Sequence, residues 1–338
     1  MGNRTTTQKA PQHLSTSTYF QRLKDLPTSL SNSQCVLHKH EIIICGGYGQ
    51  RACYSYHTIK DEYKFICEYP SDVQLWGHSI VKLVDNNNNN KRNNEIILLV
   101  WSKISNKSKN YNKWIPFTDN HNNPIIIGRY KDNSYVGMRA LISGSNNHLL
   151  FITYYPNNIS VFDLNTFRFI KHDILLTDNN IFFHCFVLNS KNGQGQEMMK
   201  TNQKYKQNYQ MLLFCLKTRL SIEYDEDDNT FQFYQLSVCK DMRHSLNMHM
   251  CVLMMLSLHK YLIQENKWTT FENTLPSSLH HCVAILSEDN DYIHIIGGKY
   301  DTYRAVSTHI KTKVCACDVS QLVNIIHYWT RTLKIKFG

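Results

Sequence analysis

The chain has 338 residues, a length that allows one large all-β domain or two smaller domains. Its net charge of +10 comes from scattered Lys and Arg side chains, and no nucleic-acid recognition motif accompanies it, so we expect no specific nucleic-acid binding. The first thirty residues are hydrophilic and the longest apolar run, MCVLMMLSL, is short, which argues against a secretion signal and against a membrane-spanning helix.

Residues 1–17 are hydrophilic and are expected to be disordered. They begin MGNRTT, which fits the M-G-x-x-x-[ST] motif for N-myristoylation of Gly2. The alternative is a chance match on a disordered segment. Because a single acyl chain gives only marginal membrane affinity, any membrane association is expected to be weak.

The first predicted strand is YFQRLKDLP (19–27), which reads as an outer strand with no inner strands before it. We expect it to pair with the last group of strands in the chain. That arrangement would tie the two ends together and remove an exposed sheet edge.

Two segments far apart in the chain share one pattern. EIIICGGYG (41–49) and YIHIIGGKY (292–300) each end an apolar strand on a Gly-Gly pair. Each follows a Leu-Pro sequence, a Leu, a Cys and another apolar strand. Gly46 and Gly297 lie 251 residues apart, about five steps of roughly 50 residues, a period typical of propeller blades.

The whole chain divides into six predicted groups of strands. They lie near residues 35–70, 78–118, 136–176, 181–237, 248–275 and 280–318. The fifth group, about 248–275, has no strand that carries Gly-Gly and is predicted to be an incomplete blade. Asn-rich and polar insertions, such as DNNNNNKRNNE, are expected to be solvated, and residues 319–338 are predicted to form a short C-terminal helix.

Aromatic residues recur seven positions apart in four of these groups. The pairs are Tyr56 and Tyr63, Phe162 and Phe169, Tyr224 and Phe231, and Tyr261 and Trp268. We expect each pair to lie on the third and outer strands of a blade, joined by a tight hairpin, with both rings between neighbouring sheets.

Four apolar residues, Gly-Gly, a tyrosine, six residues and a large aromatic residue make up the kelch motif, which is clearest in EIIICGGYGQRACYSYHTIKDEY. Residues 18–318 therefore resemble kelch-repeat β-propellers of the galactose-oxidase type. The resemblance implies an all-β, six-bladed kelch-type β-propeller in which Gly46, Gly47, Gly297 and Gly298 are architectural. Gly-Gly is missing from the middle groups, so the resemblance implies a fold more firmly than an activity.

The eleven cysteines are dispersed and include no C-x-x-C pair. Several lie in apolar runs, among them Cys45, Cys185, Cys215 and Cys282, which predicts reduced and mostly buried thiols in a cytoplasmic protein. The CAC sequence (315–317) does not have the spacing of a zinc site, and no cofactor is expected.

No catalytic signature is found. DEDDN (225–229) lacks the glycine and glutamate that an EF-hand loop needs, and it is interpreted as a hairpin turn. The sequence has no phosphate loop, no nucleophile elbow and no iron-binding kelch pattern, and its seventeen histidines are dispersed. We therefore expect that the protein is not an enzyme.

The favoured hypothesis is a non-catalytic scaffold that binds a protein partner through its blade loops. The candidate partner-binding residues follow the two Gly-Gly pairs: Tyr48, Arg51, Lys299, Tyr300, Tyr303 and Arg304. The bland alternative is that these are ordinary exposed loop residues. Two other hypotheses are a propeller enzyme or metal-binding protein with copper or iron at the channel mouth, and a degenerate family member with little function of its own.

Overall fold

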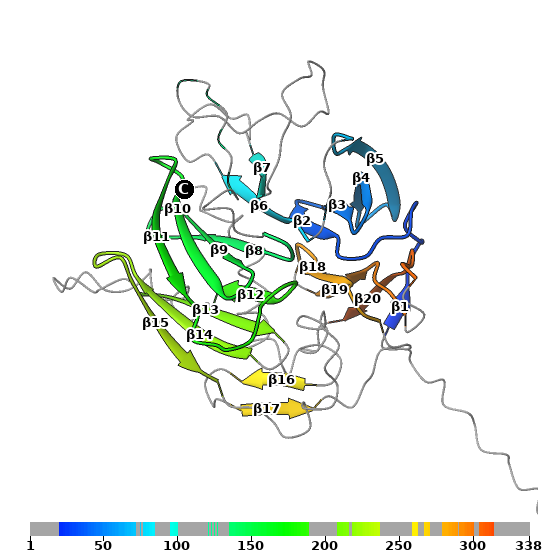
Figure 1. Ribbon diagram of the computed structural model, residues 1–338. Coiled ribbons are helices and arrows are strands. Elements are labelled where there is room, and N and C mark those ends of the chain that lie inside the picture. The colour runs from blue at the N-terminus through cyan, green and yellow to red at the C-terminus, as the bar shows by residue number, and fades with distance from the viewer. Residues whose placement is uncertain are drawn as a thin grey trace, which may run out of the picture.

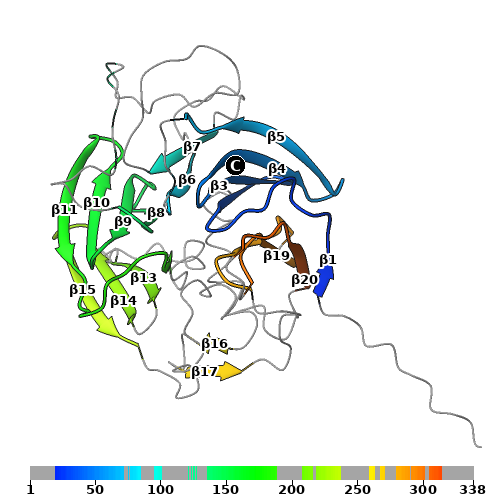
Figure 2. The ribbon, with the colours of Figure 1, turned by 45° about the vertical axis from the view of Figure 1, so that its right-hand side comes forward.

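The computed structural model describes residues 20–71, 75, 77–84, 95–100, 121, 123, 125, 127, 135–188, 208–215, 218–236, 259–262, 267–270, 279–289, 291–300 and 304–313. Every element of regular secondary structure in these described residues is a β-strand. The strands form six antiparallel sheets arranged in a ring, which is seen from two directions in Figures 1 and 2.

Four of the sheets have four strands each, and we call them blades A to D. Blade A contains β2 (Gln34–His38), β3 (Glu41–Gly47), β4 (Gln50–His57) and β5 (Glu62–Glu68). Blade B contains β8 (Arg139–Ser143), β9 (Leu149–Tyr154), β10 (Asn158–Asp163) and β11 (Arg168–Ile174). Blade C contains β12 (Cys185–Leu188), β13 (Asn208–Cys215), β14 (Thr218–Asp225) and β15 (Thr230–Gln235). Blade D contains β18 (Val283–Leu286), β19 (Tyr292–Ile296), β20 (His309–Lys313) and β1 (Phe20–Arg22).

The two remaining sheets are strand pairs. One joins β6 (Ser79–Val84) to β7 (Glu95–Val100), and the other joins β16 (His259–Leu262) to β17 (Lys267–Thr270). In Figure 1 the first pair lies between blades A and B, and the second lies between blades C and D.

The prediction of six blades is wrong, because the described residues form four blades and two strand pairs. A strand packed between two sheets needs apolar side chains to bury. After β7 the chain continues into the polar stretch 103–113, which offers no such run, and the group around β16 and β17 has no Gly-Gly strand. The predicted disordered segment 1–17 and the predicted helix 319–338 lie outside the described residues.

The N-terminal strand closes the ring, as the sequence predicts. β1 pairs with β20 in antiparallel register, with Gln21 opposite Lys311, and becomes the outer strand of blade D. The Leu23 amide then donates a hydrogen bond to the His309 carbonyl at 2.8 Å. One blade is therefore built from both ends of the described chain, which removes an exposed edge on β20.

The aromatic spacing marks the hairpin between the third and fourth strands. Tyr56 lies opposite Tyr63, Phe162 opposite Phe169, Tyr224 opposite Phe231, and Tyr261 opposite Trp268. The ring centroids of the first three pairs lie 4.9, 5.1 and 4.9 Å apart. Each of the four predicted pairs is thus a direct cross-strand pair.

The hairpin turns of blades A and C also share a hydrogen bond. The Tyr56 hydroxyl donates to the Asp61 carboxylate, and the Tyr224 hydroxyl donates to the Asn229 side-chain oxygen, both at 2.8 Å. Asp61 and Asn229 both have positive φ, a conformation that Asp and Asn tolerate better than most residues. The polar residue between the two aromatics is therefore part of the turn itself.

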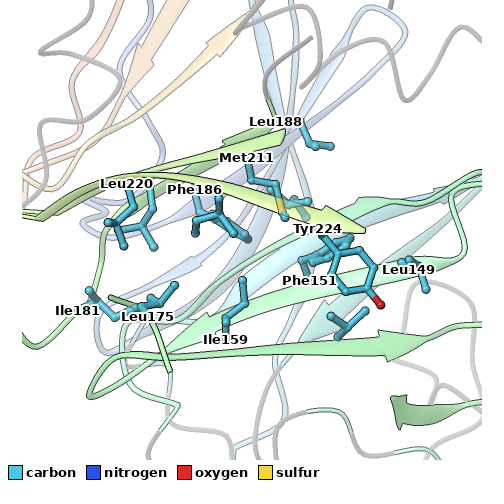
Figure 3. Close-up of a cluster of buried hydrophobic side chains, with 14 of the residues drawn as sticks. Leu149, Phe151, Ile159, Leu175, Ile181, Phe186, Leu188, Met211, Leu220 and Tyr224 are labelled. Carbon is cyan, nitrogen blue, oxygen red and sulfur yellow. The ribbon is translucent and has the colours of Figure 1, made fainter. Parts of the chain in front are cut away.

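Adjacent sheets pack face to face through apolar side chains. The cluster between blades B and C includes Phe151 and Ile159 from one sheet and Met211, Leu220 and Tyr224 from the other (Figure 3). All five are buried, and the Phe151 ring meets the Tyr224 ring edge-on at 5.1 Å. Burial of each side chain of this size contributes about 1.5–3 kcal/mol, so the ring is stabilised mainly at these sheet-to-sheet contacts.

The two Gly-Gly pairs occupy equivalent places, each at the end of the second strand of its blade. Gly46 and Gly297 have φ of +51° and +63°, a backbone conformation that residues other than glycine rarely adopt. A Cβ added to Gly297 would lie 2.5 Å from the Leu30 carbonyl oxygen, a distance that real Cβ atoms essentially never show. Glycine is needed here because the chain of one blade passes directly over the strand end of another.

Candidate functional site

Five turns with a common backbone pattern lead into the first strand of a sheet, and we call them the hub turns. Each begins with a buried apolar anchor: Leu30, Leu75, Tyr135, Ile181 or Leu279. Two residues later the backbone has positive φ, at Asn32, Gly77, Gly137, Phe183 and His281. The first strand starts two residues after that in all five cases. A left-handed residue at this point lets the chain turn sharply into the strand.

The hub turns touch one another at the centre of the ring. The Asn32 amide donates to the His281 carbonyl at 2.8 Å, and the Phe183 amide donates to the Gly137 carbonyl at 2.6 Å. A Cβ on Gly77 would lie 2.6 Å from the Gly137 Cα atom. The first strands that follow are also neighbours, in the order β18, β2, β6, β8 and β12.

Sequence reasoning missed the hub turns. Their left-handed position is occupied by Asn, Gly, Phe and His, and only Asn and Gly are residue types that indicate positive φ. The signal that could have found them is the repeated spacing of a large apolar residue four positions before each predicted first strand.

Each of three anchors also covers the end of the second strand in the preceding sheet. The Leu30 carbonyl accepts a hydrogen bond from the Gly298 amide at 2.7 Å, and the Ile181 amide donates to the Pro156 carbonyl at 2.5 Å. Leu75 packs in one cluster with Cys45 of β3. The hub turns and the turns after the second strands therefore share one face of the ring, which we call the hub face.

Tyr48 and Lys299 occupy equivalent positions on the hub face. The Tyr48 amide donates to the Ser31 carbonyl at 2.7 Å, and the Lys299 amide donates to the His280 carbonyl at 2.6 Å. Their side chains meet across the junction of blades A and D, with the Lys299 ammonium 5.2 Å from the centroid of the Tyr48 ring. The Tyr48 side chain is 50% exposed, so this cation–π pair is presented to solvent.

Two of the predicted partner-binding residues do not lie where the sequence placed them. Arg51 lies in β4 and not in the loop, because the strand resumes directly after Gly49; its guanidinium reaches the Tyr69 carbonyl at 3.4 Å. Tyr300 packs against the core of blade D, and its hydroxyl lies 3.2 Å from Thr308 Oγ1. Arg51 is therefore a strand residue, and the Tyr300 ring is partly buried against blade D.

Of the other predicted residues, Arg304 is described by the structure, whereas Gly2 and Tyr303 are not. Arg304 is exposed in the connection between β19 and β20. Tyr155, which the sequence did not single out, is 40% exposed in the turn after β9, the second strand of blade B. The side chains of Tyr261 and Trp268 also lie outside the described residues.

Two buried histidines follow hub turns and bind the preceding sheet. His78 Nε2 lies 3.0 Å from the Cys45 carbonyl oxygen, and His184 Nε2 lies 2.5 Å from Thr153 Oγ1. Burial lowers the pKa of His78 to about 3 and also lowers the pKa of His184, and the nearby Arg139 charge adds to both shifts. Both imidazoles are therefore neutral at physiological pH and act as inter-sheet hydrogen-bond partners.

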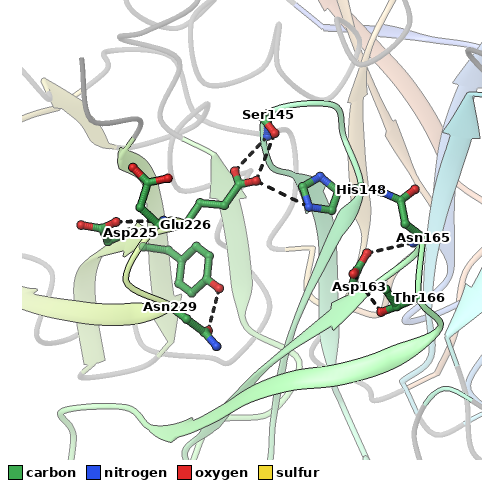
Figure 4. Close-up of polar contacts among 10 residues, drawn as sticks. Ser145, His148, Asp163, Asn165, Thr166, Asp225, Glu226 and Asn229 are labelled. Atoms are coloured by element: carbon green, nitrogen blue, oxygen red, sulfur yellow. Dashed lines mark hydrogen bonds and ion pairs between the residues drawn. The ribbon is translucent and has the colours of Figure 1, made fainter. Parts of the chain in front are cut away.

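On the opposite face of the ring, hairpin turns join blades B and C (Figure 4). The Glu226 carboxylate accepts hydrogen bonds from the Ser145 amide and hydroxyl, both at 3.0 Å, and lies 3.5 Å from His148 Nε2. The DEDDN segment forms the predicted hairpin turn. Its glutamate is not simply solvated but links two blades.

Within the part of the chain that the structure describes, no group of three or more His, Cys, Asp or Glu side chains could hold a metal ion. A helix long and apolar enough to cross a membrane is likewise not found among those residues.

No family model matches the sequence, and no curated protein matches it. Among solved structures, the structure of YjhT aligns with a TM-score of 0.50 at 10% identity, covering 87% of this chain and 97% of that chain. The fold is a β-propeller. At this identity the similarity shows the fold alone.

Two further structures align over most of the propeller. The structure of U3-55K has a TM-score of 0.39 at 8% identity, covering 87% of this chain and 98% of that chain. The crystal structure of RRP9 WD40 repeats has a TM-score of 0.38 at 8% identity, covering 88% of this chain and 98% of that chain.

Proposed function

We propose that this propeller is a non-catalytic scaffold of the kelch type that binds a protein partner through its hub face. The observation that carries the proposal is the exposed Tyr48 ring with Lys299 stacked over it. Tyrosine supplies a large contact area at a small cost in conformational entropy, and Tyr and Arg are favoured at the energetic centres of interfaces. Tyr155 and Arg304 are further exposed residues in turns after second strands, on the same face.

The backbone of this surface is held in place before any partner arrives. The Tyr48 and Lys299 amides both bind hub-turn carbonyls, so neither turn needs to be ordered on binding. Lys299 and Arg304 are cationic, and the chain carries a net charge of +10, which favours an acidic partner surface.

A cytoplasmic location and N-myristoylation of Gly2 remain part of the proposal. The seven described cysteines are all free, which supports a reducing compartment. Mass measurement of the N-terminal peptide from cells that express the protein tests the acylation directly.

Affinity purification from such cells tests the binding proposal. The bait is compared with a Tyr48→Ala, Lys299→Glu double variant and with an Ile59→Ala control. Ile59 is 70% exposed in the turn at the other end of β4, on the opposite face. We expect the double variant to lose the partners that the wild type and the control retain. Equal recovery by all three proteins would contradict the proposal.

A further inference from the structure

Three cysteines stand side by side across three neighbouring strands of blade A. Cys45 of β3 lies directly opposite Cys53 of β4, and Cys53 lies directly opposite Cys67 of β5. Cross-strand partners project from the same face of a sheet, so the three thiols form one row. They lie in the apolar cluster that packs against the β6–β7 pair.

The register decides which two thiols are best placed to join. Residues 40 and 58 are a hydrogen-bonded pair, since the Thr58 amide donates to the His40 carbonyl at 2.8 Å. Bonded and non-bonded pairs alternate along an antiparallel ladder, so Cys45 and Cys53, five positions further, are a non-hydrogen-bonded pair. Such pairs have Cα atoms about 4.5 Å apart and closer side chains, within the range a disulfide requires.

The same alternation places Cys67 less favourably for a bond with Cys53. The Tyr69 amide donates to the Arg51 carbonyl, which makes Cys53 and Cys67, two positions along, a hydrogen-bonded pair with more widely spaced side chains. Cys45 and Cys53 are 2% and 1% exposed, whereas Cys67 is only partly buried. A reagent from solution therefore meets Cys67 first.

We propose that Cys45 and Cys53 form a reversible disulfide, and that Cys67 is the thiol through which a low-molecular-weight disulfide oxidises them. Cys67 attacks the reagent disulfide and releases one thiol. Cys53 then attacks the Cys67 sulfur of the mixed disulfide and releases the second thiol, and Cys45 attacks Cys53 and returns Cys67 to the thiol. The two protein thiols lose two electrons and two protons, and one reagent disulfide becomes two reagent thiols.

The resting state of the row is reduced and slow to react. The hydrogen bond with Cys45 and burial raise the pKa of Cys53, and the hydrogen bond with Cys53 and burial raise the pKa of Cys67. Both groups remain thiols at neutral pH, and only the thiolate is nucleophilic. The exchange therefore needs a sustained excess of oxidant, which is how a structural thiol pair differs from a catalytic one.

The disulfide would enclose the turn between β3 and β4, residues 46–52, which presents Tyr48. An effect of oxidation on partner binding rests on the proposed function. The formation of the bond does not, so the chemical test below can succeed or fail independently of any binding result.

The test incubates the full-length protein with excess oxidised glutathione, blocks free thiols with N-ethylmaleimide, and digests it with trypsin without reduction. Cleavage after Lys and Arg places the three cysteines on separate peptides, 40–51, 52–60 and 65–82. We expect peptides 40–51 and 52–60 to be recovered as one linked species that dithiothreitol separates. Recovery of both peptides alkylated, or linked to other cysteine peptides, would overturn the proposal.

Two controls keep the result specific. The same incubation in concentrated urea should give mixed linkages, and an equal yield of the 40–51 and 52–60 link there would show that the fold does not select it. In the native Cys67→Ser variant the same link should form at least about tenfold more slowly, because both remaining thiols are buried. An unchanged rate would overturn the route through Cys67.

Discussion

The Tyr63 hydroxyl lies 2.6 Å from Nδ1 of His309, across the junction where the first blade meets the last. His309 Nε2 lies in turn 2.9 Å from Nδ1 of His294, and both histidines are buried. The contact between the two imidazole nitrogens can hold only one proton. The closure of the ring therefore contains a hydrogen-bonded chain whose link between the two imidazoles is lost when both are protonated.

Replacing Tyr63 with Phe removes the hydroxyl and leaves His309 Nδ1 buried without its partner. An unsatisfied buried polar group costs about 1–3 kcal/mol, and we expect the free energy of unfolding in urea to fall by that amount. Tyr234→Phe is the matched control, because its hydroxyl donates to the exposed Gln232 side chain and is itself on the protein surface. Equal stability of the Tyr63→Phe variant and the control would contradict a role of this contact in closure.

The neutral histidines make the fold sensitive to acid. Burial, with the neighbouring His294 and Lys311, lowers the pKa of His309 to about 2, and burial with Lys311 lowers the pKa of His294 to about 4. Both values lie below the unfolded value of about 6.5, so the unfolded chain binds more protons as the pH falls. The contribution of these two imidazoles to stability is complete above about pH 6.5. Below that pH it declines, with a limiting slope of about 1.4 kcal/mol per pH unit for each imidazole between its unfolded and folded pKa.

Urea denaturation at a series of pH values between about 7 and 4.5 measures this slope. His294→Gln should reduce it by the contribution of one imidazole. A wild-type stability that is flat over this range would show that the buried histidines do not control the acid response.

Gly297→Ala is expected to destabilise the propeller by more than about 3 kcal/mol, because it combines positive φ with an overlap on the Leu30 carbonyl. Gly49→Ala is the control. Gly49 also has positive φ, at +69°, but a Cβ there would meet nothing within 4 Å. It should cost only about 1–2 kcal/mol of backbone strain. Similar melting temperatures for the two variants would rule out close approach as the reason for Gly-Gly.

Leu23→Pro tests the closure by β1. Proline removes the amide that donates to His309, so this variant should lose about 2–3 kcal/mol more than Leu23→Ala, which loses only the side-chain packing. Thermal unfolding of both variants gives the difference. If the two variants unfold together, the backbone bond between the chain ends adds nothing to stability.

Local patterns in the sequence were sufficient for the hairpins and for the equivalence of the two Gly-Gly strand ends. The spacing of Tyr56 and Tyr63 and of Tyr224 and Phe231 predicts a hairpin, because a tight turn of fixed length puts residues seven apart opposite each other. The equivalence of Gly46 and Gly297 could also be predicted, since each lies at the end of the second strand of its blade. These features depend on neighbours along the chain.

Other features depended on contacts between distant residues. The sequence placed Arg51 and Tyr300 in exposed loops, yet β4 resumes early enough to take Arg51, and Tyr300 turns inward onto blade D. The number of four-stranded blades was overestimated because apolar runs show where a strand is possible, not how many strands pair into one sheet.

The sequence by itself determined the all-β class, the strand pairs and the tie between the N-terminal strand and the last blade. Only the tertiary structure decided how many sheets are complete, which turns meet at the hub, that Lys299 stacks on Tyr48, and that Cys45, Cys53 and Cys67 form a row. The physical reason is the distance along the chain over which each interaction acts. Side-chain alternation and turn chemistry act over a few residues, whereas register across a bulge and packing between sheets follow from how the whole ring closes.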